Sequence, residues 1–121
     1  MPYFAGAELT FVFDGIDGDD RLDEIAAAVR RFLALSTRDR DAAAPAVFEN
    51  YRAAHAADVE IAGPADVWRH VHPDEIRVTR HRAVYVQITA ECDWEPEHGI
   101  QLIYREGWEL TRVSEQDGHL E

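Results

Sequence analysis

Apolar and polar residues alternate near the start of the chain, and this two-residue period is typical of a half-buried strand. The apolar positions of this segment are Ala7, Leu9, Phe11 and Phe13. The alternation stops at Asp14, where a stretch rich in Asp and Gly begins, and such residues favour turns. We therefore expect a first strand over residues 7–13, followed by a loop.

After this loop the apolar residues recur every three or four positions, which predicts an amphipathic helix from about residue 21 to 35. Asp19 or Asp20 stands directly before it, and either carboxylate is suited to accept a bond from the free N–H groups of the first turn. We expect one of them to be the N-cap.

A second helix is predicted from about residue 41 to 58, with Pro45 in its first turn, where no backbone donor is lost. His55 falls on the apolar face of this helix, a position that favours a core role over metal ligation. A short third helix is expected over residues 65–71, ended by Pro73.

The rest of the chain has the alternating pattern of strands, with short turns between them. The predicted strands cover residues 75–80, 83–92, 100–105 and 108–113. Short connections between successive strands indicate antiparallel pairing. The sequence therefore predicts an α+β fold, an antiparallel sheet with two to three helices packed on one face. The element order is β-α-α-α-β-β-β-β, in a single domain over residues 1–121.

The net charge of the chain indicates which classes of partner the protein binds. The chain has 121 residues with 24 acids and 12 basic residues, a formal net charge of −12. Such a balance disfavours nucleic acid and anionic membranes as partners, and favours a basic protein. Cys92 is the one cysteine, so no internal disulfide forms, and the N-terminal residues lack the pattern of a secretory signal. We expect a cytoplasmic protein.

One segment of the chain holds several side chains that can bind a metal ion or take part in catalysis. Residues 92–99 read Cys92-Asp93-Trp94-Glu95-Pro96-Glu97-His98-Gly99, between two predicted strands. The interpretation we favour is a structural strand connection, in which Trp94 covers the end of the sheet and polar side chains bond free backbone groups. Asp117 and His119 are expected to close the same end.

Two other interpretations of this segment stay open. Cys92, Asp93 and His98, joined by Asp117 or His119, have the ligand types of zinc, although their spacing matches no standard zinc module. A catalytic arrangement would use Cys92 and His98 as a nucleophile and base, with Glu97 assisting. No established catalytic or phosphate-binding fingerprint is present, so we expect neither an enzyme nor a cofactor.

A second His pair, His70 and His72, flanks Val71. On a short helix or turn these two rings would face different ways, so we expect no joint site.

The segment 92–99, together with Asp117-Gly118-His119-Leu120, resembles the signature of a small uncharacterised bacterial family, a domain of unknown function. Proteins of this kind are similar to small cytoplasmic partner-binding domains, including immunity proteins that neutralise bacterial toxins. This resemblance implies binding to a partner and carries over no catalytic residue.

The favoured hypothesis is thus an acidic, immunity-like binding domain that neutralises a cationic toxin or another basic protein. Residues 91–121 alone hold nine acids and two arginines. Trp94, Tyr104 and Trp108 are candidate anchors for the interface, since aromatic residues dominate binding hot spots. The alternative is a small metal-binding protein or hydrolase-like enzyme centred on Cys92, Glu97, His98 and His119.

Overall fold

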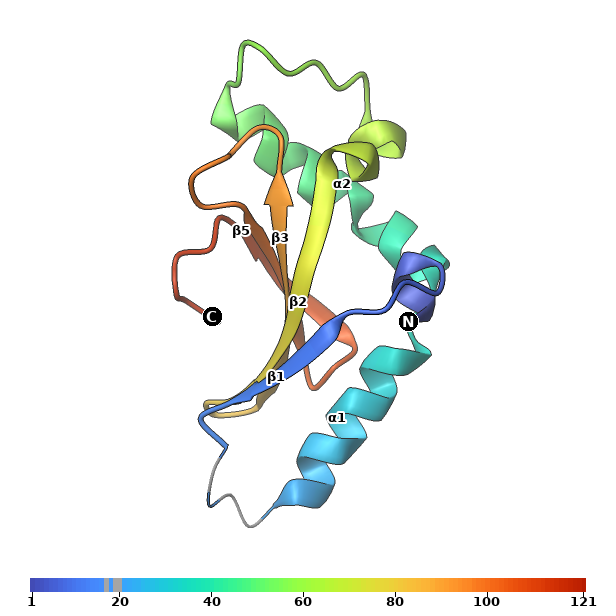
Figure 1. The fold of residues 1–121 in the computed structure, drawn as a ribbon, viewed down its shortest axis with the longest axis vertical. Helices are drawn as coiled ribbons and strands as arrows, with labels where there is room; N and C mark the ends of the chain where they lie inside the picture. Colours follow the sequence, from blue (N-terminus) through green and yellow to red (C-terminus); the bar gives the residue numbers. More distant parts are fainter. Residues whose placement is uncertain (17, 19–20) are drawn as a thin grey trace.

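The protein folds as one five-stranded sheet with its helices gathered on one side (Figure 1). The structure, a computed structural model, describes residues 1–16, 18 and 21–121. Asp19 and Asp20, one of which was expected to cap the first long helix, lie outside the described residues, and Arg21 occupies the N-cap position. In chain order the elements are the 3-10 helix η1 (Pro2–Phe4), β1 (Thr10–Asp14), α1 (Leu22–Ala34), α2 (Thr37–Ala54), the 3-10 helix η2 (Pro64–His70), β2 (Val71–Arg80), β3 (Val84–Cys92), β4 (Ile100–Arg105) and β5 (Glu109–Ser114).

The predicted α+β class and element order are confirmed, but the sheet is mixed where an antiparallel one was expected. Its strand order is β1-β2-β3-β4-β5, and β2 to β5 form an antiparallel meander. β1 pairs with β2 in parallel, with Thr10 opposite Glu75. The helices between β1 and β2 form a crossover, which returns the chain to run in the same direction as before.

The main core lies between the helices and one face of the sheet. Alternating residues of β3, among them Val86 and Ile88, are fully buried against this layer, which also holds Ile25 and Phe32 from α1 and Val47 from α2. No helix in the described part of the chain combines the length and apolar character needed to cross a membrane.

The other face of the sheet is covered in part by the segment after β5. Leu120 packs against a small apolar group formed by Ala83, Tyr85 and Ile103. The Tyr85 hydroxyl donates to Glu121 Oε1 at 2.6 Å. This segment therefore acts as a partial second cover for the sheet, opposite the helices.

Helix α2 begins four residues earlier than predicted, and Pro45 lies in its interior instead of its first turn. The start is set by a capping box: Ser36 Oγ accepts from the Arg38 N–H at 3.2 Å, and Asp39 Oδ2 accepts from the Ser36 N–H at 2.8 Å. Pro45 lies on the exposed side of the helix, where water can bond the carbonyl group that the proline leaves without a donor.

The end of α2 also differs from the prediction. The helix stops at Ala54, and His55 is its exposed C-cap in the left-handed region at φ 52°, so this ring is not on a buried face. Strand β2 likewise begins at Val71 and includes Pro73, which was expected to end the preceding helix. Pro73 is tolerated because it lies at a bulge and beyond the reach of β1, where no neighbouring strand needs its N–H.

The turn between β4 and β5 is fixed by a close approach to α1. Three residues join the strands, one more than the predicted strand bounds imply, because Arg105 pairs with Glu109. Of these three, Glu106 and Gly107 have positive φ, 55° and 85°. A Cβ on Gly107 would overlap the carbonyl oxygen of Ala28. Glycine is therefore needed here for space as well as for conformation.

Replacing Gly107 by Ala tests this close approach. We expect Gly107→Ala to lower the free energy of unfolding by several kcal/mol, because steric overlap adds to the cost of about 1–2 kcal/mol for a left-handed residue. Gly6→Ala is the matched control, since Gly6 has φ 90° but open space around it. Urea denaturation of both variants gives the two values; equal losses would show that the contact with Ala28 is unimportant.

Candidate functional site

The connection between β3 and β4 is anchored by Trp94 and Gly99. Trp94 is only 4% exposed, its ring packs edge-on against Tyr51 of α2 at 5.8 Å, and its Nε1–H donates to Asn50 Oδ1 at 2.9 Å. The Gly99 N–H donates to the Glu95 carbonyl at 2.9 Å. Gly99 has φ +65°, and a Cβ there would overlap the Ala90 carbonyl oxygen. The connection is therefore held against both α2 and the sheet.

Cys92 points into the core. It is 3% exposed, and its thiol lies 4.0 Å from the Glu95 carbonyl oxygen. Burial raises the pKa of this thiol to about 11, so it is protonated at neutral pH and a poor nucleophile or metal ligand. This arrangement gives no support to the catalytic pairing of Cys92 with His98.

Asp93 is held between two histidines. His70 Nδ1 lies 2.9 Å from Asp93 Oδ2, and His72 Nε2 lies 2.9 Å from Asp93 Oδ1. The bonds from His72 and then from His70 lower the pKa of the Asp93 carboxyl. The expectation that the two rings face different ways is wrong, because Val71 opens β2 and its neighbours on either side project to the same face.

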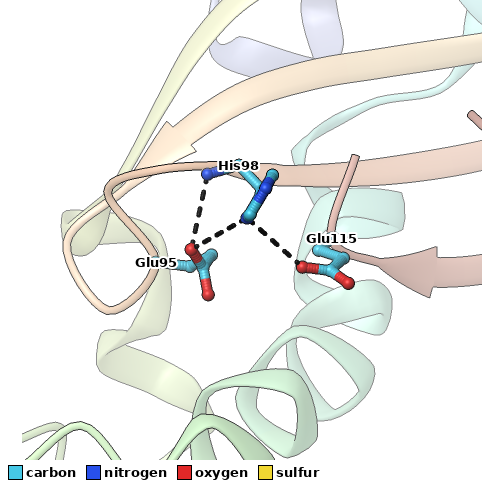
Figure 2. A group of neighbouring side chains, drawn as sticks. All are labelled: Glu95, His98 and Glu115. Carbon is cyan, nitrogen blue, oxygen red and sulfur yellow. Dashed lines mark hydrogen bonds and ion pairs between the residues drawn. The ribbon is translucent and has the colours of Figure 1, made fainter. Parts of the chain in front are cut away.

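Glu95 and His98 form a second cluster with Glu115, which follows β5 (Figure 2). His98 Nδ1 lies 3.4 Å from Glu95 Oε1 and 3.6 Å from Glu115 Oε2. One possible ligand atom from each of the three residues lies within 4.8 Å of the others. Among the described residues this is the one group of three His, Cys, Asp or Glu side chains with such a geometry.

The remaining predicted residues do not join this cluster. Glu97 is exposed, and no hydrogen bond or ion pair is found for it within the described part of the chain. Asp117 forms an ion pair with Arg112 at 2.5 Å. Bonding to the His119 N–H, and then the pairing with Arg112, lowers the pKa of the Asp117 carboxyl.

Asp117 and His119 hold the segment after β5 onto the sheet. The fully buried amide of Gln101 donates to Asp117 Oδ1 at 3.1 Å and to the His119 carbonyl at 2.9 Å. The role of these two residues is thus to cover the face of the sheet that the helices leave open. The metal ligand set that combined Cys92 with His98, Asp117 or His119 is not assembled.

Four carboxylates lie on the connection or at the end of β3, namely Glu91, Asp93, Glu95 and Glu97, and Glu115 lies beside Glu95. We call these five residues the acidic end. Within the described part of the chain, Asp93, Glu95 and Glu115 pair with histidines and not with arginines, and no ion pair is found for Glu91 or Glu97. Carboxylates elsewhere, such as Asp14 and Asp117, do pair with arginine. The acidic end therefore carries negative charge that the protein itself leaves largely uncompensated.

Sequence reasoning missed Asn50 and Glu115, and it named His70 and His72 without expecting them to act together. The His-x-His spacing is a usable signal for a strand, where residues two apart share a face. The predicted hairpin of β4 and β5 is a usable signal for Glu115. In this hairpin Ser114 pairs with Gln101, which brings Glu115 close to His98. Asn50 had no such signal.

The chain belongs to the family described as "Domain of unknown function (DUF6985)", whose profile matches residues 1–120. The expected resemblance to an uncharacterised family is confirmed at this level. Neither the curated proteins nor the solved structures contain a significant match to the chain.

The anchoring of the connection by Trp94 can be tested without changing the charge. Trp94→Phe leaves Asn50 Oδ1 without its donor, so we expect the free energy of unfolding to fall by about 1–3 kcal/mol. Trp108→Phe is the control because Trp108 is 58% exposed, and its loss should lie within about 0.5 kcal/mol of zero. Urea denaturation followed by circular dichroism gives both values. A similar loss in the two variants would contradict the anchoring role.

The Cys92 thiol gives a pH-dependent test. With its pKa near 11, the thiolate fraction at pH 8 is small and rises about tenfold for each pH unit up to that value. We expect iodoacetamide to alkylate the folded protein slowly at pH 8, and at a rate that climbs steeply towards pH 10. Protein unfolded in urea is the control and should react quickly at pH 8. Equal rates for the folded and unfolded protein would contradict the buried position.

Proposed function

We propose that this member of the DUF6985 family is a binding domain for a basic protein, and that it acts as an immunity protein that neutralises a cationic toxin. The observation that carries this proposal is the charge of the acidic end: among the described residues Asp93, Glu95 and Glu115 pair with histidines and not with arginines, and Glu91 and Glu97 are exposed. A negative surface of this kind attracts a basic partner and raises its association rate.

The net charge of the whole chain acts in the same direction. At −12 the protein attracts cations over several ångströms, and the carboxylates of the acidic end add to this attraction near the β3–β4 connection. If the toxin were a nuclease, these carboxylates would occupy the positions of nucleic-acid phosphates on its surface. The free thiol of Cys92 is compatible with a reducing compartment, and we place the protein in the cytoplasm.

The acidic end is also well supported by its surroundings. The connection is held by Trp94 and Gly99, and Gln116 Nε2 donates to the Ala90 carbonyl at 3.1 Å, next to Glu115. Side chains on a fixed backbone lose less entropy on binding than those on a mobile loop. Such a surface is therefore suited to recognition by charge.

Aromatic anchoring contributes less to the proposal than the sequence suggested. Trp94 and Tyr104 are 4% and 3% exposed, so both belong to the core and neither is available to a partner. The Tyr104 hydroxyl is bonded to that of Tyr3 at 2.8 Å. Trp108 is exposed, but it lies at the β4–β5 turn, at the opposite end of β5 from Glu115.

The proposal predicts which carboxylates matter for binding. The probes are the purified products of the genes next to the one that encodes this chain, tested by surface plasmon resonance at low and high salt. We expect a basic product to bind, and Glu91→Gln with Glu97→Gln to lower its association rate about tenfold. This double variant leaves Glu95, His98 and Glu115 intact.

The matched control removes the same charge elsewhere. Glu8 and Glu109 are exposed and lie outside the acidic end, so Glu8→Gln with Glu109→Gln should change the association rate far less. Equal effects of the two double variants would contradict recognition by the acidic end. Binding that is insensitive to salt, or the absence of binding to every neighbouring product, would also count against the proposal.

A further inference from the structure

We propose that Glu95, His98 and Glu115 bind one divalent transition-metal ion of the zinc type. This inference goes beyond recognition of a basic protein and uses a different part of the acidic end. An imidazole nitrogen and two carboxylate oxygens are a ligand set that zinc and its neighbours in the first transition row accept. The set differs from the one that the sequence suggested, since only His98 is common to both.

The distances fit an ion better than direct hydrogen bonds. His98 Nδ1 lies 3.4 Å from Glu95 Oε1 and 3.6 Å from Glu115 Oε2. Both values exceed the usual range of about 2.7–3.2 Å for an N–H···O bond. An ion with ligands at about 2.0–2.2 Å in tetrahedral geometry holds neighbouring ligand atoms about 3.3–3.6 Å apart. The two separations match two edges of such a tetrahedron, and the third pair of ligand atoms, from the two carboxylates, lies within 4.8 Å.

The electrostatics of the cluster also favour a cation. Two carboxylates approach one nitrogen from different segments of the chain, and no arginine of the described residues pairs with either. Their mutual repulsion falls if a divalent ion enters between them. Figure 2 shows the His98 ring between the two carboxylates, with Nδ1 turned towards both.

The segments that carry the ligands are placed by other groups, so the site does not depend on the ion for its geometry. The Gly99 N–H bonds to the Glu95 carbonyl at 2.9 Å, which fixes the turn between Glu95 and His98. Gln116 Nε2 bonds to the Ala90 and Ile100 carbonyls at 3.1 and 3.4 Å, which fixes the backbone next to Glu115. Support of this kind from neighbouring residues is what a preorganised site requires.

The site is open on one side. The side chains of Glu95, His98 and Glu115 are 30%, 55% and 54% exposed. Glu95 and Glu115 also line a surface hollow of about 330 Å³ together with Asn50 and Ser114. Three protein ligands and an open fourth position are typical of exchangeable or catalytic zinc, not of structural zinc, which is closed by four ligands. The chemistry thus indicates an ion that solvent or a partner's side chain can reach.

The test uses the full chain without a histidine tag, freed of metal by a chelator that is then removed. We expect ZnCl2 to bind with one-to-one stoichiometry in calorimetry, and Co²⁺ to give the intense visible absorption of a tetrahedral site. Glu115→Gln and His98→Ala should each weaken zinc binding about tenfold or more. Glu115→Gln is nearly isosteric and exposed, and thermal unfolding checks that each variant is folded.

Two controls locate the ion. Glu97→Gln changes an exposed carboxylate in the same connection and should leave the affinity unchanged. His72→Ala removes one of the rings that hold Asp93 and should also leave it unchanged. The proposal is overturned if zinc does not bind, if Glu115→Gln binds as the wild type does, or if His72→Ala abolishes binding. Because Glu91 and Glu97 are not ligands here, failure of this test leaves the partner-binding test unaffected.

Discussion

The apolar contact between the helices and one face of the sheet is the constraint on which the other features depend. Phe32 of α1, Tyr3 of η1 and Tyr104 of β4 meet in this layer, with ring centroids about 6 Å apart. Their burial joins three distant parts of the sequence in one core. Trp94 extends the same core to the end of the sheet and brings the connection after β3 against α2.

This contact explains why the segment 92–99 has both buried and exposed side chains. Cys92 and Trp94 are buried, whereas Asp93 between them is exposed and Glu95 after them is partly exposed. The alternation of the strand thus continues beyond its last residue, so that the apolar members serve the core and the acidic members face solvent. The motif combines a structural function with a charged surface, and the two uses do not compete for the same side chains.

Much of the fold could be predicted from the sequence, because the relevant signals are local. The alternation of apolar and polar residues in β3 and the turn residues Glu106 and Gly107 predicted the meander. The three- and four-residue spacing of apolar residues predicted α1. Helix α2 starts earlier than expected because the capping box at Ser36 sets its first turn, whereas the prediction rested on Pro45. The parallel pairing of β1 was not predicted. Short connections indicate antiparallel pairing only for strands that follow one another directly, and helices separate β1 from β2.

The site was harder to predict than the fold because it is made by tertiary contacts. Sequence proximity suggested Cys92 as a ligand, but the pleat turns its thiol away from His98 and into the core. Glu115 is distant in sequence and is brought beside His98 only by the register of β4 with β5. Likewise, His70 and His72 can both bond to Asp93 because β2 begins at Val71. The prediction placed the start of this strand four residues too late.

The position of β1 at the edge of the sheet has a consequence for the order of folding. The contacts within the meander of β2 to β5 join residues that are close in sequence, whereas Thr10 must find Glu75 across both helices. Closing so long a loop costs entropy before any pairing repays it. On this ground we expect the meander to form first and the amino-terminal strand to dock onto it as a late step.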